Sequence, residues 1–310
     1  MWPRDADLSA PVLCLTLRGV RPLNSSCHSK PGDADPSPMS SMNEASTMIS
    51  ENLIEQSIKR ENLFRMFQVE KFNRRRSVPC VSMMIDIDIG RLEEARSSHN
   101  GGLQKNESIT LTHVLIKAVS LALKDYPMLY GYFCGGKVIL SEKIKINVPV
   151  SEGNHVEYVV IESPECKSLS DIASEVREEV KRIRSGTGTF YLVLKRLFAL
   201  PRLFRFIASN VPSISIRNTY RNYGNFPITN FGSFGAKIGI PAISAPIIGV
   251  LCLGMIQRVS SENAGKMPNA AAILPVTMVF DHRPIDGAYC GRFLKSLKDL
   301  VEGNADDLFT

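Results

Sequence analysis

The sequence predicts one α/β domain with a mixed sheet and helices packed against it, for three reasons. Segments with the 3.6-residue apolar periodicity of helices alternate along the chain with short apolar or alternating segments typical of strands. The pattern begins with a helix and ends with a strand, a tight turn and a helix, an order typical of α/β proteins. The 310 residues are 44% hydrophobic and 22% charged, which is the composition of a globular protein that can bury a substantial core.

Residues 1–48 are predicted to be a disordered extension and residues 49–310 the folded domain. The extension is rich in proline, serine, aspartate and glycine, as in the run from Ser29 to Pro38, a composition that buries little apolar surface. The seven cysteines are scattered, without Cys-x-x-Cys pairs, so we expect reduced thiols in the cytoplasm and no metal site. The net charge of +6 suits a polyanionic cofactor, an acidic partner or an ordinary basic protein, and we predict no nucleic-acid partner.

Helices are expected over residues 51–72, 91–97, 110–125, 169–183 and 288–301. The clearest is the one over 110–125, where six apolar residues form a single stripe. His113 lies off that stripe, so we expect a surface or packing role for it. Three arginines at 74–76 end the first helix, and we interpret them as solvated, with a phosphate contact as the alternative. Ser168 or Ser170 is expected to cap the fourth helix.

Strands are expected over residues 81–89, 138–140, 144–150, 156–161, 247–256 and 271–280. In the first of them Asp86 and Asp88 share one face, which we interpret as an exposed strand face and not as a metal site. Residues 151–154 are expected to form a hairpin-like turn between two of the strands. His155 follows that turn and is expected to be exposed.

Two further segments allow more than one interpretation. The run from Ser185 to Thr189 is rich in glycine, but it lacks Gly-Lys-Ser/Thr and follows a helix, so a loop at a helix end is favoured over a phosphate cradle. Residues 190–210 are apolar and basic and are interrupted by Pro201. They can lie on a membrane surface, pack at a subunit interface or cover a ligand channel, and we favour the last two. The longest nearly uncharged apolar run, 242–256, is too short for a stable membrane insertion.

The stretch from Asp281 to Gly287 is the most informative part of the chain. It reads Asp-His-Arg-Pro-Ile-Asp-Gly and lies between an apolar strand and a helix. His282 is therefore expected to leave the end of a buried strand in a tight turn, which would hold its imidazole rigidly. A neutral imidazole is available near pH 7 and can act as a general base. A second glycine-closed turn, Ile228 to Gly235, follows another expected strand.

These motifs resemble the catalytic domain of the dihydrolipoamide acyltransferases, the core components of 2-oxoacid dehydrogenase complexes. The resemblance covers about residues 50–305. It rests on Asp-His-Arg-x-x-Asp-Gly at 281–287, on Thr229-Asn230-Phe231-Gly232, on the helix from Thr112 to Pro127, and on Asn147-Val148-Pro149-Val150 with the strand after it. It implies the fold of chloramphenicol acetyltransferase, an α/β two-layer sandwich with a mixed sheet and helices on one side.

The resemblance also implies catalytic roles. His282 is expected to be the general base that removes a proton from a thiol, without a covalent enzyme intermediate. Thr229 is expected to donate a hydrogen bond to the oxyanion, and Ser233 is the rival hydroxyl. Asp286 is expected to orient the active-site loop through an arginine.

Other matching positions are expected to bind the cofactor or to be structural. The residues expected to contact coenzyme A are Asn230, Gly232 and Ser233. Asp281 and Arg283 are taken as structural, and Gly287 is expected to permit close packing at the start of the last helix.

The resemblance implies coenzyme A as a co-substrate and a homotrimer in which His282 and Thr229 come from different subunits. The family's lipoylated Asp-Lys-Ala does not occur in the sequence, so a lipoyl group is expected only on a partner protein. We therefore expect an acyltransferase that moves an acyl group between CoA and a dihydrolipoyl thiol or similar acceptor. The alternatives are an O-acetyltransferase with a small hydroxyl acceptor and a non-catalytic trimeric scaffold of a dehydrogenase complex.

Overall fold

The computed structural model describes residues 55–69, 78–104, 107–201, 203–204, 221–259, 271–303 and 305–309. All of them belong to one compact unit, Asn52–Thr310. The predicted disordered extension, residues 1–48, and the three arginines at 74–76 lie outside the described residues, so the expectations for both stay predictions.

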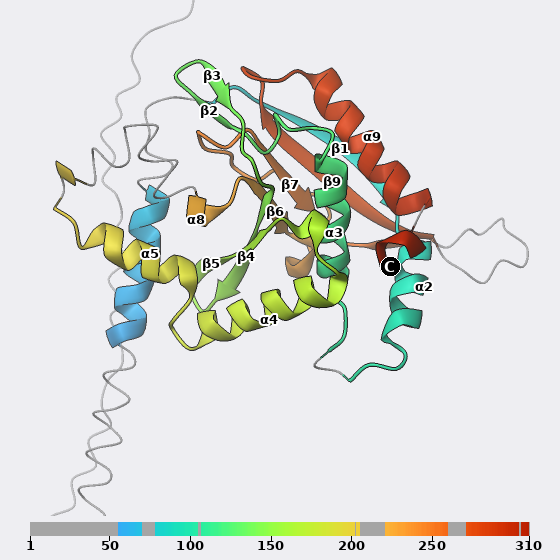
Figure 1. The fold of residues 1–310 in the computed structure, drawn as a ribbon, viewed down its shortest axis with the longest axis horizontal. Helices are drawn as coiled ribbons and strands as arrows, with labels where there is room; N and C mark the ends of the chain where they lie inside the picture. Colours follow the sequence, from blue (N-terminus) through green and yellow to red (C-terminus); the bar gives the residue numbers. More distant parts are fainter. Residues whose placement is uncertain are drawn as a thin grey trace, which may run out of the picture. The chain divides into compact units, whose positions relative to one another are not determined.

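A mixed sheet forms the centre of the fold (Figure 1). Within the described residues its strands follow the order β1 (Cys80–Asp88), β9 (Ala271–Asp281), β7 (Gly249–Leu253), β6 (Phe226–Asn230), β4 (Lys145–Glu152) and β5 (His155–Glu162), and β8 (Gln257–Val259) also pairs with β9. Strand β6 runs parallel to both β4 and β7, whereas β9 runs antiparallel to β1, β7 and β8, and β4 to β5. The expected mixed sheet is therefore confirmed.

Helices cover one face of this sheet, as expected. The described helices are α2 (Gly90–Asn100), α3 (Leu111–Leu123), α4 (Leu169–Arg184), α5 (Thr189–Phe198), α8 (Arg221–Tyr223) and α9 (Gly287–Gly303), with a further helix over residues 55–69 and short 3₁₀ turns at Pro164–Cys166, Gly232–Phe234 and Asp306–Phe309. In Figure 1, α3 lies between α4 and α9 in front of the sheet. Along β1 the inner side chains pack on the core while the alternate ones, including Asp86 and Asp88, are exposed. The exposed strand face predicted for these two aspartates is thus confirmed.

Strand β9 lies at the centre of the core and is buried along most of its length. Its neighbours β1 and β7 satisfy its backbone on both sides, and its apolar side chains join the main hydrophobic cluster. Phe293 of α9 packs edge-on against Phe226 of β6 and against Tyr126, with ring centroids 5.9 and 5.7 Å apart. Both β9 and α9, which flank the Asp281–Gly287 turn, are therefore packed into the core.

His113 belongs to the first turn of α3, and it is buried. Its Nδ1 accepts a hydrogen bond from the Thr110 amide, 3.2 Å away, while Thr110 Oγ1 accepts one from the His113 amide. Burial, followed by the charge of Arg177, lowers the pKa of His113 from 6.5 to about 4. Of the two roles expected from the sequence, packing is therefore right and surface exposure is wrong.

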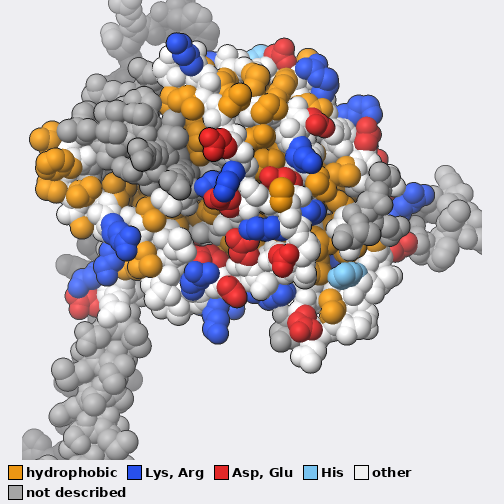
Figure 2. Space-filling view, viewed as in Figure 1, with side chains coloured by type: hydrophobic (Ala, Val, Ile, Leu, Met, Phe, Trp, Pro, Cys, Tyr) orange, Lys and Arg blue, Asp and Glu red, His pale blue; other side chains and the backbone are white. Residues whose placement is uncertain are grey.

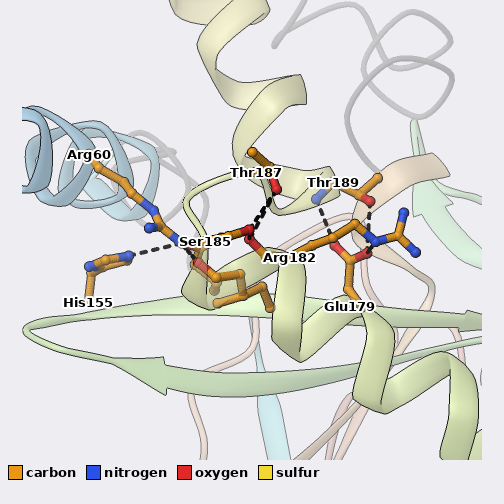
Figure 3. Close-up of polar contacts among 9 residues, drawn as sticks. Arg60, His155, Glu179, Arg182, Ser185, Thr187 and Thr189 are labelled. Atoms are coloured by element: carbon orange, nitrogen blue, oxygen red, sulfur yellow. Dashed lines mark hydrogen bonds and ion pairs between the residues drawn. The ribbon is translucent and has the colours of Figure 1, made fainter.

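A second hydrophobic cluster joins helix 55–69 to α5 and β5. Phe64 and Phe67 of the first helix pack with Phe190 of α5. Figure 3 shows the polar contacts beside this cluster. Arg60 donates to the buried carboxylate of Glu157 and to the carbonyl of Ile183.

His155 does not have the exposed position that the sequence suggested. Its Nε2 lies 3.1 Å from Glu157 Oε1, and its ring stacks on Phe64 at a centroid distance of 4.9 Å. Its side chain is only 7% exposed, because helix 55–69 covers the end of the β4–β5 hairpin. That helix is distant in sequence, so the turn pattern alone did not indicate the burial.

Some elements differ in length from those expected. The strand predicted over 247–256 is shorter, as β7, and α2 extends past the predicted end at residue 97 to Asn100. A hairpin of β2 (Tyr132–Cys134) and β3 (Lys137–Ile139) contains a strand that the sequence reading missed. The sequence signal for it is the pair Gly135-Gly136, because both residues have positive φ and a type I′ hairpin turn requires this at both central positions.

Candidate active site

An ion pair between Asp281 and Arg283 stabilises the turn at the end of β9. The carboxylate of Asp281 is buried and pairs with Arg283, whose Nε lies 2.8 Å from Oδ1. The hydrogen bonds to Asp281 raise the pKa of Arg283, and its guanidinium lies 4.9 Å from the centre of the Phe133 ring. The amide of His282 donates to the carbonyl of Pro79 at 2.9 Å. The structural role expected for Asp281 and Arg283 is what the contacts show.

The imidazole of His282 has one nitrogen engaged within this turn. Its Nδ1 lies 3.1 Å from the carbonyl oxygen of Ile285. A carbonyl oxygen only accepts hydrogen bonds, so Nδ1 carries the proton and the neutral ring has its lone pair on Nε2. The side chain is exposed, so Nε2 can be reached from outside the chain. In this tautomer Nε2 is the ring nitrogen that can accept a proton.

Asp286 caps the last helix. Its Oδ1 accepts a hydrogen bond of 2.7 Å from the amide of Tyr289, in the first turn of α9. Among the described residues Arg283 pairs with Asp281, and the arginine expected to act with Asp286 stays a prediction. Ile285, the residue before the cap, is buried in the core. By capping the start of α9, Asp286 therefore helps to fix the Ile285 carbonyl, and that carbonyl orients the imidazole of His282.

The environment of Gly287 does not match the close packing expected for it. A Cβ placed on this residue would meet nothing within 4 Å, and its φ is not positive. Close packing at the start of α9 does not require glycine here.

The second glycine-closed turn lies at the end of β6. Asn230 Oδ1 accepts a hydrogen bond from the amide of Ser233 at 3.1 Å, and Ser233 Oγ donates to the carbonyl of Asn230 at 2.7 Å. A Cβ on Gly232 would lie 2.3 Å from the carbonyl oxygen of Gly254, so this turn needs glycine where two backbones approach. The rival hydroxyl, Ser233, is thus already donating within the turn.

A cavity of about 210 Å³ lies beside this turn. All three residues predicted to bind coenzyme A line it, and the other lining residues come from α3, from β7 and the three residues after it, and from β9. The full lining is Leu111, Thr112, Leu115, Asn230, Gly232, Ser233, Leu253, Gly254, Met255, Ile256 and Leu274. The sequence reading missed the contribution of α3 and of Gly254, because only the folded chain brings these segments beside β6.

His282 and Thr229 lie toward opposite ends of the strands in one chain, with β7 between β6 and β9. Thr229 pairs in register with Cys252, and Cys252 pairs with Thr277 of β9, five residues before His282. At about 3.4 Å per residue and about 4.8 Å per strand spacing, the two backbones lie about 20 Å apart. A single chain therefore does not bring these two predicted catalytic residues together.

The glycine-rich loop after α4 is a helix end, as favoured. Thr187 Oγ1 donates to the carbonyl of Arg182, and Ser185 Oγ lies 2.9 Å from Thr187 Oγ1 (Figure 3). The amide and hydroxyl of Thr189 both donate to the carboxylate of Glu179, at 2.6 and 3.0 Å. These donors are already bonded within the protein, and the Thr189 donors face the negative charge of Glu179. Such a loop is unsuited to binding a phosphate.

The fold is that of the catalytic cores of dihydrolipoamide acetyltransferases. A probable dihydrolipoamide acetyltransferase from Listeria monocytogenes superposes with a TM-score of 0.57 at 24% identity, covering 80% of this chain and 91% of that one. The cubic core of a pyruvate dehydrogenase multienzyme complex superposes with a TM-score of 0.63 at 22% identity, covering 81% and 92%. The expected fold class is therefore confirmed.

The chain belongs to the family of 2-oxoacid dehydrogenases acyltransferase (catalytic domain), whose model matches residues 57–190 and 215–310. The dihydrolipoyllysine-residue acetyltransferase component of the Zymomonas mobilis pyruvate dehydrogenase complex is 27% identical over 270 residues, covering 87% of this chain and 55% of that protein. The lipoamide acyltransferase component of the Bacillus subtilis branched-chain alpha-keto acid dehydrogenase complex is 25% identical, covering 73% and 47%. This chain thus spans about half the length of these relatives.

Proposed function

We propose that this protein transfers an acyl group between coenzyme A and a dihydrolipoyl thiol carried by a partner protein. The family membership supports the reaction class, and the geometry of His282 carries the proposal. A histidine whose Nδ1–H is fixed by a backbone carbonyl presents Nε2 as a proton acceptor to a thiol. The relatives named above act in complexes that use dihydrolipoyllysine or lipoamide, which favours the same acceptor here.

The reaction needs one proton acceptor and one hydrogen-bond donor. Nε2 of His282 takes the proton of the attacking thiol, and the sulfur forms a bond to the carbonyl carbon of the thioester. The tetrahedral oxyanion accepts a hydrogen bond from the Thr229 hydroxyl. When the intermediate collapses, the carbon–sulfur bond of the leaving group breaks, and the leaving thiolate takes the proton back from Nε2. No bond to the enzyme forms.

The site is completed by a second copy of the chain in this proposal. Thr229 lies about 20 Å from His282 of its own chain along the sheet, too far for both to touch one tetrahedral carbon. A cyclic homotrimer places one surface of each copy against a different surface of its neighbour, because its contacts are heterologous, so the His282 end of one copy can meet the Thr229 end of the next. The cavity beside Asn230 and Ser233 would then hold the end of the coenzyme A chain that points at the neighbour's His282.

A related enzyme offers a parallel for these roles. The structure of the Azotobacter vinelandii dihydrolipoamide acetyltransferase, which superposes with a TM-score of 0.63, was used to investigate a serine, a histidine and an asparagine in its catalytic mechanism. That asparagine follows the histidine by four positions, as Asp286 follows His282 here. We propose that Thr229 takes the place of the serine and Asp286 that of the asparagine.

The test is a transfer assay with acetyl-CoA and free dihydrolipoamide. His282→Ala should lower kcat by about 1000-fold, within the range for loss of a general base, and Thr229→Ala by about 100-fold. His99→Ala, which removes another exposed histidine, is the matched control and should change neither kcat nor KM. Unchanged transfer in the first two variants would show that the residue assignment is wrong.

The acceptor is tested in the same assay. Small hydroxyl acceptors offered in place of dihydrolipoamide should give no product. Acetylation of a hydroxyl with no transfer to dihydrolipoamide would favour the O-acetyltransferase. A chain that binds no coenzyme A in calorimetry but retains dehydrogenase partners in a pull-down would instead be a scaffold.

A further inference from the structure

The segment that follows α4 departs from the rest of the family. The family model stops matching at residue 190 and resumes at 215, whereas the structure describes residues 191–201 and 203–204 within that interval. We propose that α5 and the residues after it, up to Phe204, form a peripheral docking surface for membranes that contain anionic lipids. This surface is called the α5 surface below. The proposal does not depend on the catalytic role of the chain.

The inner side of α5 is anchored to the domain. Phe190 and Leu194 are buried, and the Phe190 ring packs edge-on against Phe67 and Tyr158 at 5.2 and 5.1 Å. The first residue of the helix, Thr189, is bonded to Glu179 of α4 through its amide and its hydroxyl. The opposite side of the helix is therefore presented in a fixed orientation.

The outer side of α5 and its continuation carry exposed apolar side chains. Leu192 is 42% exposed and Leu200 45%, and exposure rises to 67% at Leu203 and 59% at Phe204. Figure 2 shows hydrophobic side chains projecting at the left margin of the domain, over the end of α5. Single exposed leucines need no explanation, but four large apolar side chains within thirteen residues indicate a surface that is covered in use.

The charges of the α5 surface have one sign. Lys195 and Arg196 are both exposed and stand between the apolar residues in sequence. From residue 189 to 214 the sequence contains no aspartate or glutamate. A helix with large apolar side chains and only cationic charges matches the boundary between anionic headgroups and acyl chains, where the apolar groups are buried and the cations meet phosphate.

Other occupants fit these charges less well. A symmetric contact between two copies of this face would bring two surfaces that both carry the cations Lys195 and Arg196 together, and their like charges would repel. Among the described residues, no helix is long and apolar enough to cross a bilayer. The contact we propose is interfacial binding through α5 and its continuation, which is the membrane-surface alternative for residues 190–210 and not the subunit interface or channel cover that the sequence favoured.

Co-sedimentation of the full chain with vesicles tests the proposal. One set of vesicles is pure phosphatidylcholine, and the other contains about one-third phosphatidylserine. We expect binding to the anionic set only, and weaker binding as salt is raised, because surface charges are screened. Lys195→Gln with Arg196→Gln should weaken binding by roughly 25-fold, about five-fold for each cation. Leu203→Ser with Phe204→Ser should abolish it.

The β3 hairpin provides a matched control. Lys137, Ile139 and Leu140 are also exposed, with Ile139 at 43% and Leu140 at 59%. Lys137→Gln with Ile139→Ser and Leu140→Ser should therefore leave vesicle binding unchanged. Circular dichroism and light scattering of every variant report folding and molar mass.

Several outcomes would overturn the proposal. They are equal binding to both vesicle sets, no binding to either, or equal loss in the control variant. A fall in molar mass for Leu203→Ser with Phe204→Ser would assign the surface to contacts between copies of the chain. Binding to polyglutamate more tightly than to anionic vesicles would assign it to an acidic protein partner.

Discussion

Gly232→Ala tests the backbone crossing that shapes the candidate binding turn. The added Cβ would lie 2.3 Å from the Gly254 carbonyl oxygen, 2.5 Å from its carbonyl carbon and 2.7 Å from the Met255 amide nitrogen. All three atoms belong to the backbone, so no rotamer change relieves the contact. Reaching an ordinary contact requires a shift of about 1 Å, and overpacking of this kind costs typically 1–3 kcal/mol. We expect about 3 kcal/mol, the upper end of that range.

The expected loss can be measured by heat and by activity. For a domain of this size, about 3 kcal/mol corresponds to a fall in Tm of about 6–12 °C. The shift also displaces Asn230 and Ser233, which line the cavity. A misplacement of about 1 Å can cost about 100-fold in rate, so acyl transfer should fall by a similar factor at a temperature where the variant is folded.

Gly303→Ala is the matched control, because a Cβ there meets nothing within 4 Å and its φ is not positive. It should unfold at the wild-type temperature and retain full activity. Differential scanning calorimetry of the two variants decides the matter. If Gly232→Ala unfolds within about 2 °C of the wild type, the close approach to Gly254 does not constrain the turn and the reasoning is refuted.

Three other predictions follow from the turn and from buried or partly buried groups. Asp286→Ala should cost about 1 kcal/mol in urea unfolding through loss of the α9 cap, whereas Asp286→Asn should keep stability; equal losses would contradict the capping role. The pKa of His113 is lowered to about 4 in the folded protein. As pH falls below about 6.5, His113 is therefore protonated in the unfolded chain but not in the folded one. The free energy of unfolding should drop by about 3 kcal/mol between about pH 6.5 and about pH 4. His113→Gln should flatten that part of the curve of unfolding free energy against pH. Cys80 is exposed, and it pairs in register with Asp281, the residue before His282. Partial burial of its sulfur raises the pKa of the thiol, so iodoacetamide should modify it and inhibit transfer faster at higher pH. The Cys80→Ser variant should resist this inhibition. Inhibition of Cys80→Ser at the wild-type rate would place the reactive thiol elsewhere.

The sequence predicted the fold where the signals are local. The apolar run before Asp281, the turn and the α9 pattern lie next to one another along the chain, so their order was readable, and the structure has β9 and α9 there. Thr110 and Ser168 accept hydrogen bonds from the first turns of α3 and α4; the Ser168 cap was expected, because capping depends on neighbouring residues.

Features that depend on distant segments were not readable. The burial of His155 comes from helix 55–69, and the fit of Gly232 comes from Gly254 on another strand. In both cases the contact joins residues that are far apart in the sequence, and sequence periodicity does not predict such contacts.

Complementation between inactive variants tests the central claim, an acyl-transfer site built from two copies of the chain. His282→Ala and Thr229→Ala subunits are unfolded together in equal amounts, refolded, and assayed with acetyl-CoA and dihydrolipoamide. If each site takes its histidine from one copy and its threonine from the next, random assembly gives intact sites at about a quarter of the interfaces, and activity should recover to about a quarter of wild type. Activity that stays at the mean of the two separate variants would contradict a shared site.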